Sequence, residues 1–129
     1  MNHKCPVLRQ EQAQRQDKSI YWTGRWRKLR LDVLDSQEYV CLWSLYVDGK
    51  VRECNVCHHI VEIEQDYSQA YEVDNLIGVE GDVHKRIHAL YKIDKYKTIK
   101  IIKECKRLWD DGIKLEGLGK LRELGNKIK

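Results

Sequence analysis

Four of the five histidines fall within 31 residues of this 129-residue chain, at His58, His59, His84 and His88. The pattern around the last two predicts a helix, so that rings four residues apart project from one face. His58 and His59 stand at the end of a predicted strand, where adjacent side chains point to opposite sides. The helical pair has the spacing of two ligands for one divalent metal, and one of the adjacent pair can join them. The other imidazole, whose ordinary pKa is about 6.5, is then free to accept a proton.

The apolar periodicity predicts how these histidines are framed. Trp22, Trp26, Leu29 and Val33 recur at helical spacing and predict a helix over residues 20–36. The predicted elements that follow are a β-hairpin with strands in 39–47 and 51–63 and a turn at Asp48-Gly49, a loop over 64–74, a helix over 83–92, a basic amphipathic helix over 96–110, and a short last helix that carries Leu115, Leu118, Leu121 and Leu124.

Composition limits the class of protein. Hydrophobic residues make up 42% of the chain and charged residues 34%, which is too apolar for a disordered chain, and the length fits one domain. No apolar run approaches the roughly 18 residues that span a bilayer, and the N-terminal segment lacks a signal-peptide core. Five cysteines leave one unpaired in any disulfide framework, so reduced thiols in a cytoplasm are expected, with no membrane partner.

Positive charge is concentrated in the C-terminal third. Residues 92–129 contain 12 Lys and Arg against 6 Asp and Glu, a net charge of +6, whereas residues 1–91 contain 12 against 14, a net charge of −2. Such a basic segment favours an anionic partner, of which nucleic acid is the commonest, and a solvated helical surface is the alternative. The candidate DNA contacts on the polar face of the 96–110 helix are Lys97, Lys100, Lys103 and Arg107.

The histidine-rich stretch resembles a known family. Residues 57–91, CHHIVEIEQDYSQAYEVDNLIGVEGDVHKRIHALY, are similar to the HNH motif of the ββα-metal endonucleases. The signature elements are His58-His59, then Asn75, then His84 with His88 four residues later. The steps from Asn75 to His84 and to His88 resemble those of colicin-type DNases. Residues 21–41 resemble the leading helix of small phage-type HNH proteins, so the resemblance covers residues 20–92.

The resemblance implies a role for each matching position. His59 would be the general base that activates water, and Asn75 would orient it and pin the loop. The metal ligands would be His58, His84 and His88, the last of which could instead hold the phosphate. The charges of Lys85 and Arg86, between the two helical histidines, make them further candidates for DNA phosphate contacts, with plain solvated residues as the alternative.

The cysteines depart from the family pattern. Many small relatives carry two CxxC pairs that bind a structural zinc, but the first position here reads Cys41-Leu-Trp-Ser44 and the second lacks cysteine. We therefore expect no structural zinc. Cys54 and Cys57 form a new CxxC, for which buried thiols are favoured over a metal site because residues three apart on a strand face opposite sides.

The sequence thus predicts an α+β fold with a ββα-metal core, an N-terminal helix and basic C-terminal helices. Its parts would be a flexible arm (1–19), an HNH nuclease core (20–92) and a basic helical extension packed on the core (93–129). The expected function is metal-dependent hydrolysis of DNA with one divalent ion, Zn, Ni, Mn, Co or Mg, in the cytoplasm of a bacterial host if the chain is phage-encoded. The alternatives are a catalytically silent HNH scaffold that binds DNA or protein, and a protein in which the metal is purely structural. The oligomeric state is left open.

Overall fold

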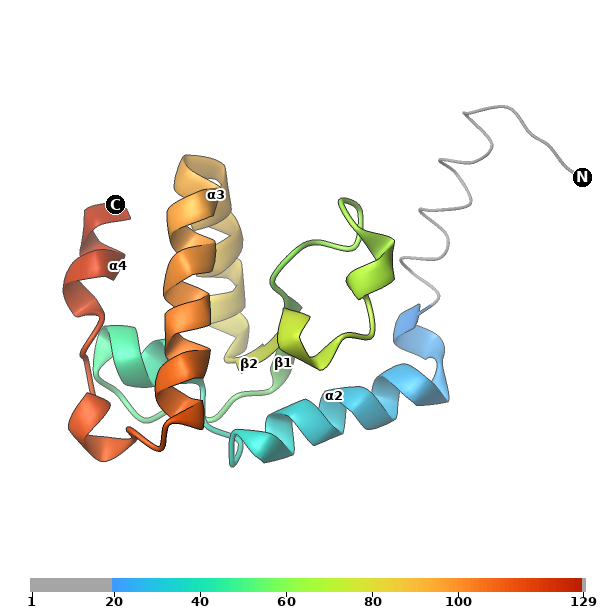
Figure 1. Ribbon diagram of the computed structural model, residues 1–129, viewed down its shortest axis with the longest axis horizontal. Helices are drawn as coiled ribbons and strands as arrows, with labels where there is room; N and C mark the ends of the chain where they lie inside the picture. Colours follow the sequence, from blue (N-terminus) through green and yellow to red (C-terminus); the bar gives the residue numbers. More distant parts are fainter. Residues whose placement is uncertain (1–19, 129) are drawn as a thin grey trace, which may run out of the picture.

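The computed structural model describes residues 20–128, and the predicted arm lies outside this range. The main elements are helix α2 (Gly24–Ser36), strands β1 (Val56–His59) and β2 (Leu76–Val79), helix α3 (Gly81–Asp110) and helix α4 (Arg122–Ile128). The two strands form one antiparallel sheet, and α3 begins two residues after β2, so the predicted α+β class and the ββα order are confirmed. Figure 1 shows α2 running along one edge of the molecule, with α3 and α4 standing beside each other.

The predicted hairpin around Asp48-Gly49 is wrong. Residues 41–47 are all buried. Residues 42–48 are helical and end in a π-helical turn (Ser44–Asp48), which Gly49 closes with a φ of 70°. Within the predicted first strand (39–47), only Val40 forms a strand-like pair, an isolated bridge to Glu53. A short run that is apolar on every side has no period that separates a strand from a buried helix, so the aromatic and β-branched residues misled the prediction.

The observed hairpin pairs residues much farther apart. His58 pairs with Ile77 and His59 with Leu76, and the connection between the strands contains 3₁₀ turns at Tyr67–Gln69 and Val73–Asn75. Because adjacent strand residues face opposite sides, this register sends the two histidine rings in opposite directions. The placement of His58-His59 at a strand end therefore agrees with the sequence-based expectation.

The C-terminal end of α2 is fixed on β2. The Gln37 side chain accepts from the Gly78 N–H at 2.7 Å and donates to the Gly78 carbonyl at 2.9 Å. A Cβ atom at Gly78 would lie only 2.7 Å from Leu34 Cδ2, so the close approach of helix and strand requires glycine. At the other end, the Thr23 hydroxyl caps α2 by accepting from the Trp26 N–H at 3.0 Å. The contacts with Gly78 therefore hold α2 beside the sheet.

Helix α3 consists of two helical segments joined at Asp94, whose φ of −155° and ψ of 88° are not helical. The first segment carries His84 and His88. The second is the predicted amphipathic helix, and its apolar residues Ile101, Ile102, Cys105 and Leu108 are buried in the main core, against which Trp109 packs partly buried. Each such side chain contributes roughly 1.5–3 kcal/mol before entropy is subtracted, so this segment substantially stabilises the fold. Of the leucine repeat, Leu121 is buried, whereas Leu118 and Leu124 are exposed. No helix in the described part of the chain could cross a bilayer.

Candidate metal centre and active site

Three histidines from two elements converge on one point. His58 projects from β1, and His84 and His88 from the first segment of α3, and each offers a ring nitrogen within 4.8 Å of the others. The Nε2 atoms of His84 and His88 are 3.0 Å apart. Imidazole nitrogens bind divalent transition metals at about 2.0–2.1 Å, so three ligand atoms at this separation need only small adjustments to hold one ion. His58, His84 and His88 could therefore hold a metal.

Burial favours the neutral form of two of these rings, His58 and His84. His58 is fully buried, and desolvation, followed by the neighbouring His84 and His88, lowers its pKa to about 3. The pKa of His84 is lowered as well, first by burial and then by His88. A metal ligand must carry a free lone pair, so His58 and His84 stay available to an ion at lower pH than an ordinary imidazole would.

His59 faces the other side of the sheet. Its Nε2 lies 2.9 Å from the carbonyl oxygen of Ala70, and its ring stacks on the indole of Trp26 with centroids 4.9 Å apart and planes 17° apart. Burial lowers the pKa of His59, although the Ala70 carbonyl opposes this shift. The ring is therefore neutral near pH 7, and it lies outside the metal cluster.

Asn75 closes the connection between the strands. Its side-chain oxygen accepts from the Val61 N–H at 2.8 Å, and its amide donates to the carbonyls of Val61 at 3.0 Å and Gln69 at 3.3 Å. Gln69 precedes Ala70, whose carbonyl binds His59. Asn75 thus pins the backbone that holds the His59 ring, and its side chain acts on the ring through that backbone.

A cavity of about 320 Å³ joins the metal cluster to His59, and His58, His59, His84 and His88 all line it. Among the described residues, Arg30 of α2 is the only Lys or Arg in its wall. Its Nη2 donates to the Asn55 carbonyl at 2.6 Å, and within residues 20–128 it has no carboxylate within salt-bridge distance. Glu62, also in the wall, is paired with Lys95 at 2.8 Å. The cavity therefore combines imidazoles with one cation that is free to meet an anion.

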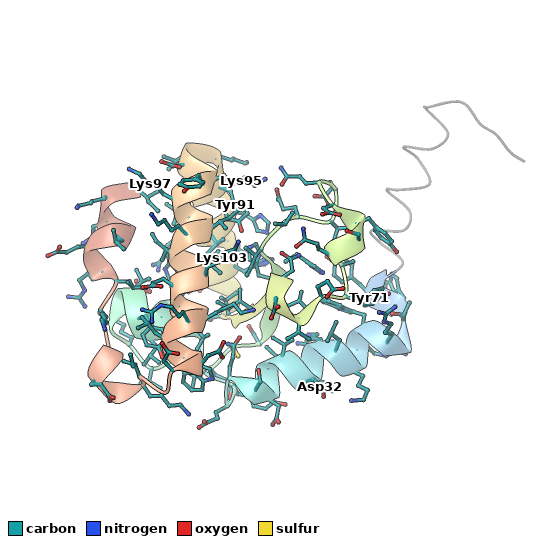
Figure 2. The ribbon with its side chains drawn as sticks, viewed as in Figure 1. Asp32, Tyr71, Tyr91, Lys95, Lys97 and Lys103 are labelled. Atoms are coloured by element: carbon teal, nitrogen blue, oxygen red, sulfur yellow. The ribbon has the colours of Figure 1, made fainter. Side chains whose placement is uncertain are left out.

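The candidate DNA contacts lie away from this cavity. Lys85 is exposed, and Arg86 pairs with both carboxylate oxygens of Asp48, at 2.7 and 2.9 Å. Neither lines the histidine cavity. On the second segment of α3, Lys97, Lys100 and Lys103 are exposed, and Figure 2 labels two of them. Arg107 is held by Glu104 at 2.7 Å and by Asp111 at 2.8 Å.

The four described cysteines are free and buried. Burial raises the pKa of Cys54 to about 11 and that of Cys57 to about 12, which disfavours the thiolate that a metal requires. The two belong to different apolar clusters, Cys54 in the main core and Cys57 beside Trp26. Within residues 20–128, the histidine triad is the one group with the spacing of a metal site.

Comparison with known proteins supports the family resemblance. No protein-family model matches the chain, and no curated protein matches it. Among solved structures, the chain is similar to the HNH endonuclease of the deep-sea thermophilic bacteriophage GVE2, whose crystal structure was determined with manganese ion. The TM-score is 0.64 and the identity 25%, over 69% of this chain and 96% of that one. The chain therefore has the fold of an HNH endonuclease, as its sequence motif predicts.

Three residues at the site were not predicted from the sequence. Trp26 and Arg30 are four residues apart on α2, a spacing that places both on one helix face, but nothing in the sequence joins that face to His59. Tyr91 lies three residues after His88, on the same face of α3 as the two histidines. That second spacing is visible in the sequence and extends the His84, His88 pattern by one turn.

Proposed function

We propose that this protein is a metal-dependent HNH endonuclease that hydrolyses DNA phosphodiester bonds. One observation carries the proposal: His59, which is outside the metal cluster, opens onto the same cavity as the cluster while a backbone carbonyl occupies one of its two ring nitrogens. A hydrolase of this kind needs a bound ion and a separate base near one scissile bond. The fold shared with the phage GVE2 enzyme supports the same assignment.

His59 has the tautomer of a general base. A carbonyl oxygen only accepts hydrogen bonds, so the Nε2 atom that faces Ala70 must carry the proton. In the neutral ring, Nδ1 then holds the free lone pair and takes a proton from the attacking water. Asn75 supports this role by fixing the carbonyl of Gln69, next to Ala70.

The metal would be held by His58, His84 and His88. When bound, a divalent ion there supplies Lewis-acid stabilisation of negative charge on the phosphate. Three imidazoles suit Zn, Ni, Co or Mn better than Mg, which prefers oxygen ligands. The manganese ion of the related phage enzyme is consistent with this donor set.

Arg30 would add a phosphate contact inside the cavity. Its guanidinium lines the cavity and donates one N–H to the Asn55 carbonyl, so its other N–H groups remain available to an anion. Guanidinium groups bind phosphate oxygens in a bidentate geometry, so Arg30 would hold the DNA strand at the site of cleavage.

The remaining contacts would be sequence-independent. Lys97, Lys100 and Lys103 are exposed and would neutralise DNA phosphates, as would Lys85. Arg86 and Arg107 are already paired with carboxylates and would have to exchange these partners for phosphate. We therefore rank the lysines above the two arginines as DNA contacts.

Cleavage of supercoiled plasmid DNA tests the proposed function. Purified protein is stripped with chelator and then supplied with Mn²⁺, Zn²⁺, Ni²⁺, Co²⁺ or Mg²⁺ in separate reactions. We expect nicked or linear product with at least one transition metal and none with chelator. A protein that binds DNA and metal but cleaves with none of the ions would instead be a silent HNH scaffold.

A further inference from the structure

We infer that Tyr91 is a positioning residue of the metal centre, whose hydroxyl fixes the tautomer of His58 and makes Nδ1 the atom of His58 that binds the ion. The inference rests on the proposed function in taking His58, His84 and His88 as the ligands. It goes further by assigning the ligating atom of His58 and the residue that selects it.

The direction of two hydrogen bonds determines the tautomer. The Tyr91 hydroxyl lies 2.7 Å from the Ile60 carbonyl oxygen, which can only accept, so the single hydroxyl proton points there. The same hydroxyl oxygen lies 3.0 Å from Nε2 of His58 and must accept in that bond. Nε2 of His58 therefore carries the ring proton, and the lone pair of the neutral ring is on Nδ1.

The two hydrogen bonds that link His58, Tyr91 and Ile60 are held in place because all three residues are buried. His58 lies on β1, Ile60 follows it by two residues, and Tyr91 comes from α3, one turn beyond His88. The rings of Tyr91 and His58 meet edge to face with centroids 5.5 Å apart. A buried hydrogen-bond donor or acceptor without a partner costs about 1–3 kcal/mol, so neither bond is easily given up.

Metal-bound imidazoles generally donate their second N–H to a neighbouring acceptor, which orients the ring and raises its basicity. Tyr91 supplies that acceptor to His58. Packing alone would be served equally by phenylalanine, whereas the observed bonds use both the donor and the acceptor capacity of the hydroxyl.

Zinc binding by Tyr91→Phe tests the inference without any measurement of cleavage. Calorimetric titration of chelator-stripped protein with Zn²⁺ should show an affinity roughly 10–100-fold weaker than wild type. In the metal-free wild type, long-range ¹H–¹⁵N NMR spectra should show His58 protonated at Nε2, and the variant should show a mixture of tautomers.

Tyr46→Phe is the matched control, because Tyr46 is also buried and also donates to a backbone carbonyl, that of Ile113, away from the histidines. It should bind zinc as wild type does. Tyr91→Phe with wild-type zinc affinity, or wild-type His58 protonated at Nδ1, would overturn the inference alone. A wild type that binds no zinc, nickel or manganese would overturn the proposed function and this inference together.

Discussion

The indole of Trp26 lies nearly parallel to the imidazole of His59, with ring centroids 4.9 Å apart. This contact joins α2 to β1 across 33 positions of sequence, and Tyr21 meets both rings edge-on. Together with the Ala70 carbonyl, the stack opposes a flip of the His59 ring, which would exchange a nitrogen for a carbon at each position. The leading helix therefore contributes directly to the geometry of the proposed base.

Trp26→Leu should lower the cleavage rate at saturating DNA by roughly 10–100-fold, because small displacements of a catalytic group carry large kinetic costs. Trp26→Phe, which retains a stacking ring, should recover most of the rate. Single-turnover cleavage, measured well below the melting temperature, reports the effect. Val33→Ala removes side chain from the same apolar cluster and serves as the control. Equal rate losses in Trp26→Leu and Val33→Ala would show that Trp26 acts only through stability.

Acid should destabilise the metal-free protein. Folding lowers the pKa of His58 from its ordinary value to about 3 and also lowers those of His59 and His84. Between pH 6.5 and 3 the unfolded chain therefore binds more protons than the folded one, so the free energy of unfolding falls as the pH falls through this range. Urea unfolding of chelator-treated protein at about pH 7 and about pH 5 measures this change in the free energy of unfolding. Equal midpoints at the two pH values would contradict the burial of neutral histidines.

The sequence predicted the clustering of the three histidines better than it predicted the fold around them. Local spacing was sufficient for His84 and His88, and strand alternation separated His58 from His59. By contrast, residues 41–47 are all buried, so their composition could not reveal a helical turn. The approach of Trp26 and Arg30 to the cavity depends on how α2 packs on the sheet, and long-range packing of this kind leaves no local pattern.

The lysine face of α3 should add affinity for DNA without specificity. Replacing Lys97, Lys100 and Lys103 with glutamine should reduce the slope of log affinity against log salt by up to about 0.9 for each phosphate that the variant no longer neutralises. Adding Arg107→Gln should change little, because its guanidinium is already paired with Glu104. Fluorescence anisotropy with labelled duplex at several salt concentrations gives the slope.

A control for this face removes the same number of charges at exposed cations elsewhere that form no salt bridge within residues 20–128, by Arg27→Gln, Lys50→Gln and Lys92→Gln. If both triple variants change the slope equally, the contribution is general charge and the face is solvated surface. Melting temperature and metal content should stay close to wild type in both.

One divalent ion should bind per chain. The histidine triad is the single candidate cluster among residues 20–128, and the thiols of Cys54 and Cys57 are buried with raised pKa values. Elemental analysis after dialysis against Zn²⁺ should give one equivalent, unchanged in the double variant Cys54→Ala, Cys57→Ala. Two equivalents in wild type, falling to one in that variant, would reveal a second site at the cysteines.

The separation of base from metal is tested most directly by comparing His59→Ala with His84→Ala on the same plasmid and with the same zinc titration. His59→Ala should bind zinc like wild type but cleave about 10²–10⁴-fold more slowly, the usual contribution of a general base. His84→Ala should lose both zinc binding and cleavage. Near wild-type cleavage by His59→Ala, or loss of zinc binding in that variant, would contradict a nuclease in which His59 is the base and His58, His84 and His88 hold the ion.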